Sequence, residues 1–200
     1  YIKNLADGSI TTVTTDGEKN KIINGVPDWV YQEEFGILNS LKWSPSSNTL
    51  AFIRFDESQV PMYSMTMYEG DCHPNKDYSL YPGSYDYKYP VAGEKNSVVS
   101  VMAYDLATSR LQKMNLPITD NDYVPHIDYG TQDDRLMVST LNRTQNDLHI
   151  YAVNPATTQA TEVYAEQSTS WIDSKSANDV MYYDTFFVMP SEKSGYMHLY

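Results

Sequence analysis

The sequence predicts an all-β chain: a partial β-propeller of about three to four four-stranded blades, with a short helical insertion and a tyrosine-rich extension arm. Two observations predict the β class. Strand-favouring residues are frequent, with 18 Tyr among 200 residues, and no long segment has the apolar spacing of a helix. A third observation predicts blades. Tyr104, Tyr151 and Tyr200 occupy equivalent places in similar segments, 47 and 49 residues apart, and a period of roughly 40–50 residues is typical of propellers.

In each repeat the tyrosine is followed by a polar turn and then by a second predicted strand. These second strands are residues 10–14 after Tyr1, 110–114 after Tyr104 and 159–163 after Tyr151, and a fourth copy begins at 198–200. The interval from Tyr1 to Tyr104 is about twice as long as the later ones. It therefore holds either two blades or one blade with insertions.

Further apolar segments supply the other strands of each repeat. They are residues 41–45, 50–55, 126–129, 135–140, 148–153, 180–183 and 185–189. The segment 191–195 is predicted to be a turn with Gly195 at a positive φ. The best candidate for a helix is a short one across Pro27–Phe35, with Pro27 or Asp28 near its start.

Two insertions interrupt the repeats, and the whole of 1–200 is otherwise expected to be one portion of a propeller domain. The first insertion, 25–39, carries the predicted helix. The second, 58–93, contains seven tyrosines, and its part 81–90 is extended and rich in turn residues. A projecting hairpin with exposed tyrosines is typical of a docking surface; the alternative is a local cap on the blade.

Composition excludes several classes of function. The net charge is −12, and no cluster of Lys and Arg is present, so nucleic acid is not an expected partner. No run of 18 apolar residues could span a membrane. The single Cys72 excludes an internal disulfide, and the scattered histidines form no metal-binding motif, so neither a metal site nor a cofactor is expected. His126 and His149 lie in predicted strands and are interpreted as structural.

The adjacent carboxylates of Glu33 and Glu34 are the candidate binding site. They follow Trp29 and Tyr31 and precede an apolar run that starts at Phe35. Like charges so close together repel unless a cation lies between them, and an ammonium group is the natural guest. They lie in the last turn of the predicted helix, where negative charge interacts unfavourably with the helix dipole. Because this position lowers the stability of the helix, it favours a functional role for the two glutamates. The alternative is a solvated corner of a helix.

Several segments resemble one known family. They are 28–35 (DWVYQEEF), 43–45 (WSP), 55–61 (FDESQVP), 89–96 (YPVAGEKN), 142–146 (NRTQN) and 191–196 (SEKSGY). In this order they are similar to the dipeptidyl peptidase IV family of the prolyl oligopeptidase clan, and closest to its bacterial members. The resemblance covers most of the chain. The family usually has three glutamates in its motif; here the first is Gln32, which is not one of the two anchoring positions.

This resemblance implies a function for the acidic pair. The family combines an eight-bladed propeller with an α/β-hydrolase domain, and it releases Xaa-Pro or Xaa-Ala dipeptides from free N-termini. Its glutamate pair binds the α-ammonium of the peptide substrate, a role that falls on Glu33 and Glu34 here. The arm 58–93 resembles the family's extension that contributes to homodimer contacts. The resemblance also implies a periplasmic or secreted protein.

The catalytic part of that family is not found in this sequence. The nucleophilic serine would lie in a Gly-x-Ser-x-Gly motif, and none occurs in the 200 residues. The chain begins at Tyr1 without Met, so we expect an excised piece or a mature product. We therefore expect a propeller fragment that holds no catalytic residue and is inactive alone.

Two other classes of function stay open from the residues alone. One is a non-catalytic propeller that binds protein partners through its face; a downstream Gly-x-Ser-x-Gly motif would argue against it. The other is a carbohydrate-active propeller, which would need Asp and Glu from several blades around a central pit. The fold by itself does not decide between them.

Overall fold

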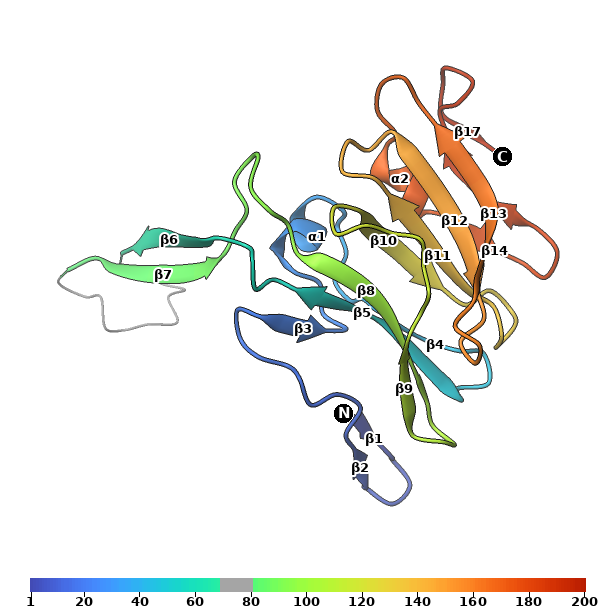
Figure 1. Cartoon of the computed structure of the whole chain (residues 1–200), viewed down its shortest axis with the longest axis horizontal. Helices are drawn as coiled ribbons and strands as arrows, with labels where there is room; N and C mark the ends of the chain where they lie inside the picture. Colours follow the sequence, from blue (N-terminus) through green and yellow to red (C-terminus); the bar gives the residue numbers. More distant parts are fainter. Residues whose placement is uncertain (69–80) are drawn as a thin grey trace.

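The computed structural model describes residues 1–68 and 81–200, and it consists mainly of antiparallel strands (Figure 1). Two large sheets lie side by side, and a two-stranded arm projects away from them. Cys72, His73 and Tyr78, on which parts of the sequence analysis rest, lie outside the described residues. No helix among the described residues is long and apolar enough to cross a membrane.

The first large sheet has five strands. They are β3 (Ile22–Asn24), β4 (Leu41–Trp43), β5 (Thr49–Asp56), β8 (Val98–Asp105) and β9 (Arg110–Lys113). Both β3 and β4 pair with β5, β3 at its C-terminal half and β4 at its N-terminal half. They therefore form one interrupted column, and the sheet has the four columns of a propeller blade.

The second large sheet is an uninterrupted antiparallel meander. Its strands, in spatial order, are β10 (Tyr123–Asp128), β11 (Leu136–Leu141), β12 (Asp147–Val153) and β13 (Ala160–Gln167). Every residue of β11 is buried, because this central strand is covered on both faces. Tyr104 in β8 and Tyr151 in β12 occupy the third column of their sheets, which explains the repeat seen in the sequence.

The remaining elements are short. They are β1 (Ile2–Lys3) with β2 (Ile10–Thr11), β6 (Met62–Met67) with β7 (Gly83–Lys88), β14 (Met181–Tyr182) with β15 (Phe187–Val188), β16 (Pro190–Ser191) with β17 (His198–Leu199), and the helices α1 (Trp29–Glu33) and α2 (Ser174–Asn178). The strands of each named pair hydrogen-bond to each other. The pair β6–β7 is the projecting arm in Figure 1.

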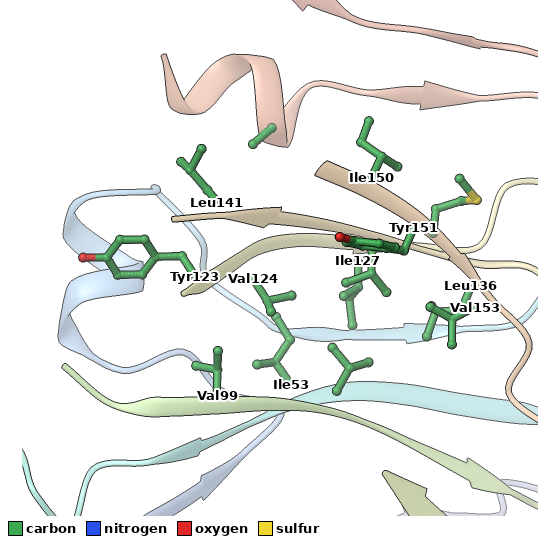
Figure 2. Close-up of a cluster of buried hydrophobic side chains, with 14 of the residues drawn as sticks. Ile53, Val99, Tyr123, Val124, Ile127, Leu136, Leu141, Ile150, Tyr151 and Val153 are labelled. Carbon is green, nitrogen blue, oxygen red and sulfur yellow. The ribbon is translucent and has the colours of Figure 1, made fainter. Parts of the chain in front are cut away.

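The hydrophobic core lies between the two large sheets (Figure 2). Ile53 of β5 and Val99 of β8 face Val124 and Ile127 of β10, and all four side chains are at most 4% exposed. Close packing of two twisted sheets through β-branched side chains is the expected way for neighbouring blades to join.

The prediction of an all-β partial propeller is confirmed. The long first interval contains the pair β1–β2 and one four-column sheet, which is interrupted by α1 and by the arm. The short helix is also confirmed, with Asp28 as its N-cap. Gly195 has the predicted positive φ, 99°. Several predicted strands are shorter than expected, among them 10–14 and 185–189.

Candidate functional site

The helix α1 sits on a closed loop that leaves and rejoins the first sheet at one point. The Gly25 N–H donates to the Ile53 carbonyl (2.9 Å), the Ser40 N–H donates to the Gly25 carbonyl (3.0 Å), and the Ile53 N–H donates to the Ser40 carbonyl (2.8 Å). Gly25 has φ +74°, a backbone conformation that residues with a side chain rarely adopt. The base of the insertion is therefore tied to β5 by backbone hydrogen bonds.

Asp28 begins the helix and fastens it to the first sheet. Its carboxylate accepts from the Tyr31 N–H at 3.0 Å, as an N-cap does, and from the Ser97 hydroxyl at 2.6 Å. Asp28 is only 6% exposed. Burial raises the pKa of its carboxyl, and the hydrogen bonds from Ser97 and Tyr31 oppose that rise.

Tyr31 fastens the same helix to the second sheet. Its hydroxyl oxygen accepts from the backbone N–H of Val124 in β10 at 2.9 Å. Its ring, which is 1% exposed, packs against Phe35, Phe55 and Tyr123 with centroid separations of 5.2, 4.9 and 6.1 Å. Figure 2 shows Tyr123 beside the helix. The helix thus spans the junction of the two sheets.

Glu33 and Glu34 are presented at the far end of this helix. Glu33 is its last residue and Glu34 its C-cap, and both side chains are exposed. Neither carboxylate forms a hydrogen bond or an ion pair with any other residue that the structure describes. Gln32, by contrast, donates from its side-chain amide to the Pro27 carbonyl at 2.8 Å. Gln32 therefore closes the helix onto its own start, and the two glutamates stay available for a ligand.

A polar group surrounds the Tyr123 phenol, which lies close enough to Glu34 for the two charges to interact. The Asn96 amide donates to the Tyr123 hydroxyl at 2.6 Å, and the Arg143 guanidinium donates to the Glu94 carbonyl. Burial raises the pKa of the Tyr123 phenol; the Glu34 carboxylate adds to the rise and Arg143 opposes it. The site thus combines exposed negative charge with a hydroxyl already held by a hydrogen bond.

Sequence reasoning did not connect the hydrogen-bonded pair Asn96 and Tyr123 with the acidic pair. They lie more than 60 residues from it along the chain, and each falls just before or at the start of a strand. No local pattern connects them to the helix. Two signals could have suggested proximity: Asn96 lies in a segment that resembles the family, and Tyr123 precedes a predicted strand.

His149 and His126 contact carboxylate and tyrosine side chains of the second sheet and its neighbours. The His149 Nδ1 lies 2.7 Å from Glu162 and its Nε2 lies 3.2 Å from Asp147, both within the second sheet. The ring of His126 stacks on Tyr182, and burial lowers its pKa. In residues 1–68 and 81–200 no group of three or more His, Cys, Asp or Glu side chains is arranged to hold a metal ion.

Taken together, the two four-column sheets define a portion of a β-propeller, and the insertion presents an acidic pair on a helix held between the blades. The protein-family model described as "Dipeptidyl peptidase IV (DPP IV) N-terminal region" matches residues 1–200. The chain belongs to this family.

Known proteins of the family are similar over the whole chain. The crystal structure of Porphyromonas gingivalis dipeptidyl peptidase 4 superposes with a TM-score of 0.91 at 40% identity, covering 99% of this chain and 27% of that one. Dipeptidyl peptidase 4 of Trichophyton rubrum is 31% identical, covering 100% of this chain and 26% of its own. Human prolyl endopeptidase FAP is 28% identical, covering 100% of this chain and 27% of its own. The chain therefore spans about a quarter of the length of these relatives.

Proposed function

We propose that this chain is the substrate-gating propeller portion of a serine exopeptidase that releases Xaa-Pro or Xaa-Ala dipeptides from free N-termini. In this proposal Glu33 and Glu34 bind the α-ammonium of the peptide. The observation that carries it is the pair itself. Two adjacent, exposed carboxylates without hydrogen bonds or ion pairs to the described residues end a helix whose Asp28, Tyr31 and Gln32 side chains are all hydrogen-bonded.

The chemistry of the ammonium group supports this role. An α-amino group has a pKa of about 8 and is largely cationic at neutral pH. Two carboxylates can hold it through charge-assisted hydrogen bonds, each worth roughly 1.5–3 kcal/mol. Such an anchor fixes the distance from the N-terminus to the reacting carbonyl. It therefore sets the cut after the second residue and excludes blocked N-termini.

The catalytic groups of this reaction would come from outside the 200 residues. The proposal assigns them to an α/β-hydrolase domain with a Ser-Asp-His triad, so this chain positions the substrate and performs no bond-breaking step itself. The glutamates act as an anchor and not as a general acid or base. No cofactor takes part. A homodimer of the complete protein, in the periplasm or secreted, belongs to the same proposal.

The test uses the complete protease and a Gly-Pro chromogenic substrate. We expect Glu33→Gln and Glu34→Gln each to lower kcat/KM by roughly 10- to 100-fold, because each removes a charge-assisted hydrogen bond to the ammonium. Glu18→Gln, at an exposed glutamate before β3, is the matched control and should keep wild-type activity. The N-acetylated peptide should already be a poor substrate of the wild type. Wild-type rates in both glutamate variants would contradict the proposal and favour the alternative interpretation, in which the pair is a solvated corner of a helix.

The arm favours a second candidate, a propeller that binds protein partners without catalysis. Tyr63 and Tyr85 are 44% and 51% exposed on its surface, and exposed aromatic side chains are typical of protein interfaces. Failure of the complete protein to release any dipeptide, with a partner bound through the arm, would favour this candidate over the exopeptidase.

A further inference from the structure

A continuous row of aromatic rings runs along the arm toward the helix that carries the acidic pair. Tyr85 contacts Tyr87 at a centroid separation of 5.7 Å, Tyr87 contacts Tyr63 at 6.2 Å, and Tyr63 contacts Tyr89 at 5.2 Å. Tyr87 also contacts Tyr89 directly at 5.9 Å. All four rings belong to the hairpin β6–β7 or follow it at once.

The row ends on α1. Tyr89 meets Trp29 edge to face with ring centroids 4.2 Å apart, the shortest ring separation in the row. Trp29 is the first residue of the helix and packs partly against the hydrophobic core. Edge-to-face aromatic pairs are favourable beyond the area they bury, so this contact holds the start of the helix against the base of the arm.

Polar contacts hold the base of the arm together beside this ring contact. The Lys88 ammonium, at the end of β7, donates to the Val60 carbonyl at 2.7 Å and to the Ser58 carbonyl at 3.4 Å. The buried carboxylate of Glu57 feels the charges of both Lys88 and Asp28. The charges at the base of the arm and at the N-cap of α1 therefore lie close enough to interact through Glu57.

We infer that the base of the arm positions the glutamate pair, with the Trp29–Tyr89 contact as the coupling between them. This inference rests on the proposed function of the pair. The lever is short. An α-helix rises about 1.5 Å per residue, so Glu33 lies only about 6 Å along the axis from Trp29. A tilt at the start of so short a helix moves the carboxylates at its end. Trp29 and Tyr89 are thus positioning residues, which act on the substrate through Glu33 and Glu34.

The test compares variants at the two ends of the row in the complete protease. Tyr89→Leu should raise the KM for a Gly-Pro chromogenic substrate by about three- to tenfold, the size that the loss of one aromatic contact supports. Tyr89→Phe keeps the ring and should restore the wild-type KM. Tyr85→Leu, at the far end of the row, is the matched control and should leave the KM unchanged.

Two further measurements separate positioning from general damage to the fold. The rate at which a small fluorophosphonate labels the catalytic serine should stay at the wild-type value in Tyr89→Leu, because that probe has no ammonium group. In the double variant Trp29→Leu with Tyr89→Leu, the losses should be smaller than the product of the single losses, since both remove one contact.

The inference is overturned if Tyr89→Leu leaves the KM unchanged, if its labelling rate falls in parallel with peptide cleavage, or if the two losses multiply independently. The glutamate variants keep this result apart from the proposed function. If Glu33→Gln and Glu34→Gln lose activity while Tyr89→Leu does not, only the positioning role of the arm fails. If the glutamate variants keep full activity, the proposed function itself fails.

Discussion

Asp28 and Glu57 are two carboxylates, each 6% exposed, that lie between α1 and the base of the arm. Burial raises the pKa of both, the charge of Asp28 adds to the rise at Glu57, and Lys88 opposes it there. A buried charge is costly unless it is paired, yet the Asp28 carboxylate also accepts two hydrogen bonds that hold the helix. At the scale of single residues, the helix is therefore held by a group whose ionised form is disfavoured.

This arrangement predicts a pH dependence of stability. A carboxyl whose pKa is raised on folding stabilises the folded state fully below its unfolded pKa, and that contribution is lost as the pH rises through the folded value. For Asp28 and Glu57 the loss begins above the ordinary values of 3.8 and 4.5. We expect the double variant Asp28→Asn with Glu57→Gln to have a flatter profile of Tm against pH between about pH 4 and 7. Calorimetry of the propeller transition checks this, and parallel profiles for variant and wild type would contradict it.

At the scale of elements, α1 is a five-residue helix whose place is decided by its neighbours. So short a helix is not stable by itself, because nucleation costs more than its few hydrogen bonds return. Ser97, directly before β8, and Val124 in β10 each donate one hydrogen bond to side chains of the helix and its N-cap. The acidic pair is therefore positioned by two sheets and not by the helix sequence alone.

Tyr31→Phe tests this bridge between the sheets. It removes the acceptor of the Val124 N–H and leaves a buried donor unpaired, so we expect a loss of about 1–3 kcal/mol in the free energy of unfolding. Tyr104→Phe is the matched control: its ring is 3% exposed, and its hydroxyl forms no hydrogen bond with the described residues. Urea denaturation compares the two. Hydrogen exchange at the Val124 amide should become faster in Tyr31→Phe only. Equal stability of both variants would show that the Tyr31–Val124 hydrogen bond does not stabilise the fold.

Over the whole molecule, several large apolar side chains stay exposed. Phe186 is 59% exposed, Trp171 53% and Trp43 39%. Phe186 lines a cavity of about 700 Å³ between the second sheet and the segment that contains β14 and β15. An exposed aromatic side chain beside a cavity is typical of a surface that other protein covers.

We therefore expect the isolated 200-residue chain to self-associate. Its exposed apolar surfaces and free strand edges favour contacts between copies. Sedimentation velocity over a range of concentrations should show species larger than the 22.8 kDa monomer. Phe186→Ser should shift the distribution toward monomer, with Thr185→Ser next to it as the control. A single monomeric species at every concentration would contradict the expectation.

Sequence patterns predicted much of this structure because they are local. The period from Tyr104 to Tyr151 reflects equivalent columns of neighbouring sheets, and apolar segments identified β5, β11 and β12 to within one or two residues. The boundaries of β2 and β15 were predicted less well, since edge pairing and not residue preference ends a short strand.

The amino-acid sequence was enough to establish the β class and the family and to point to Glu33 and Glu34, because strand-favouring segments and a contiguous motif are properties of neighbouring residues. The packed structure was needed to see that residues 22–113 form one interrupted sheet, that the Tyr31 hydroxyl accepts from the Val124 N–H, and that Tyr89 meets Trp29. These contacts join residues about 60 or more positions apart. Packing of sheets brings them together, and no pattern along the chain records that packing.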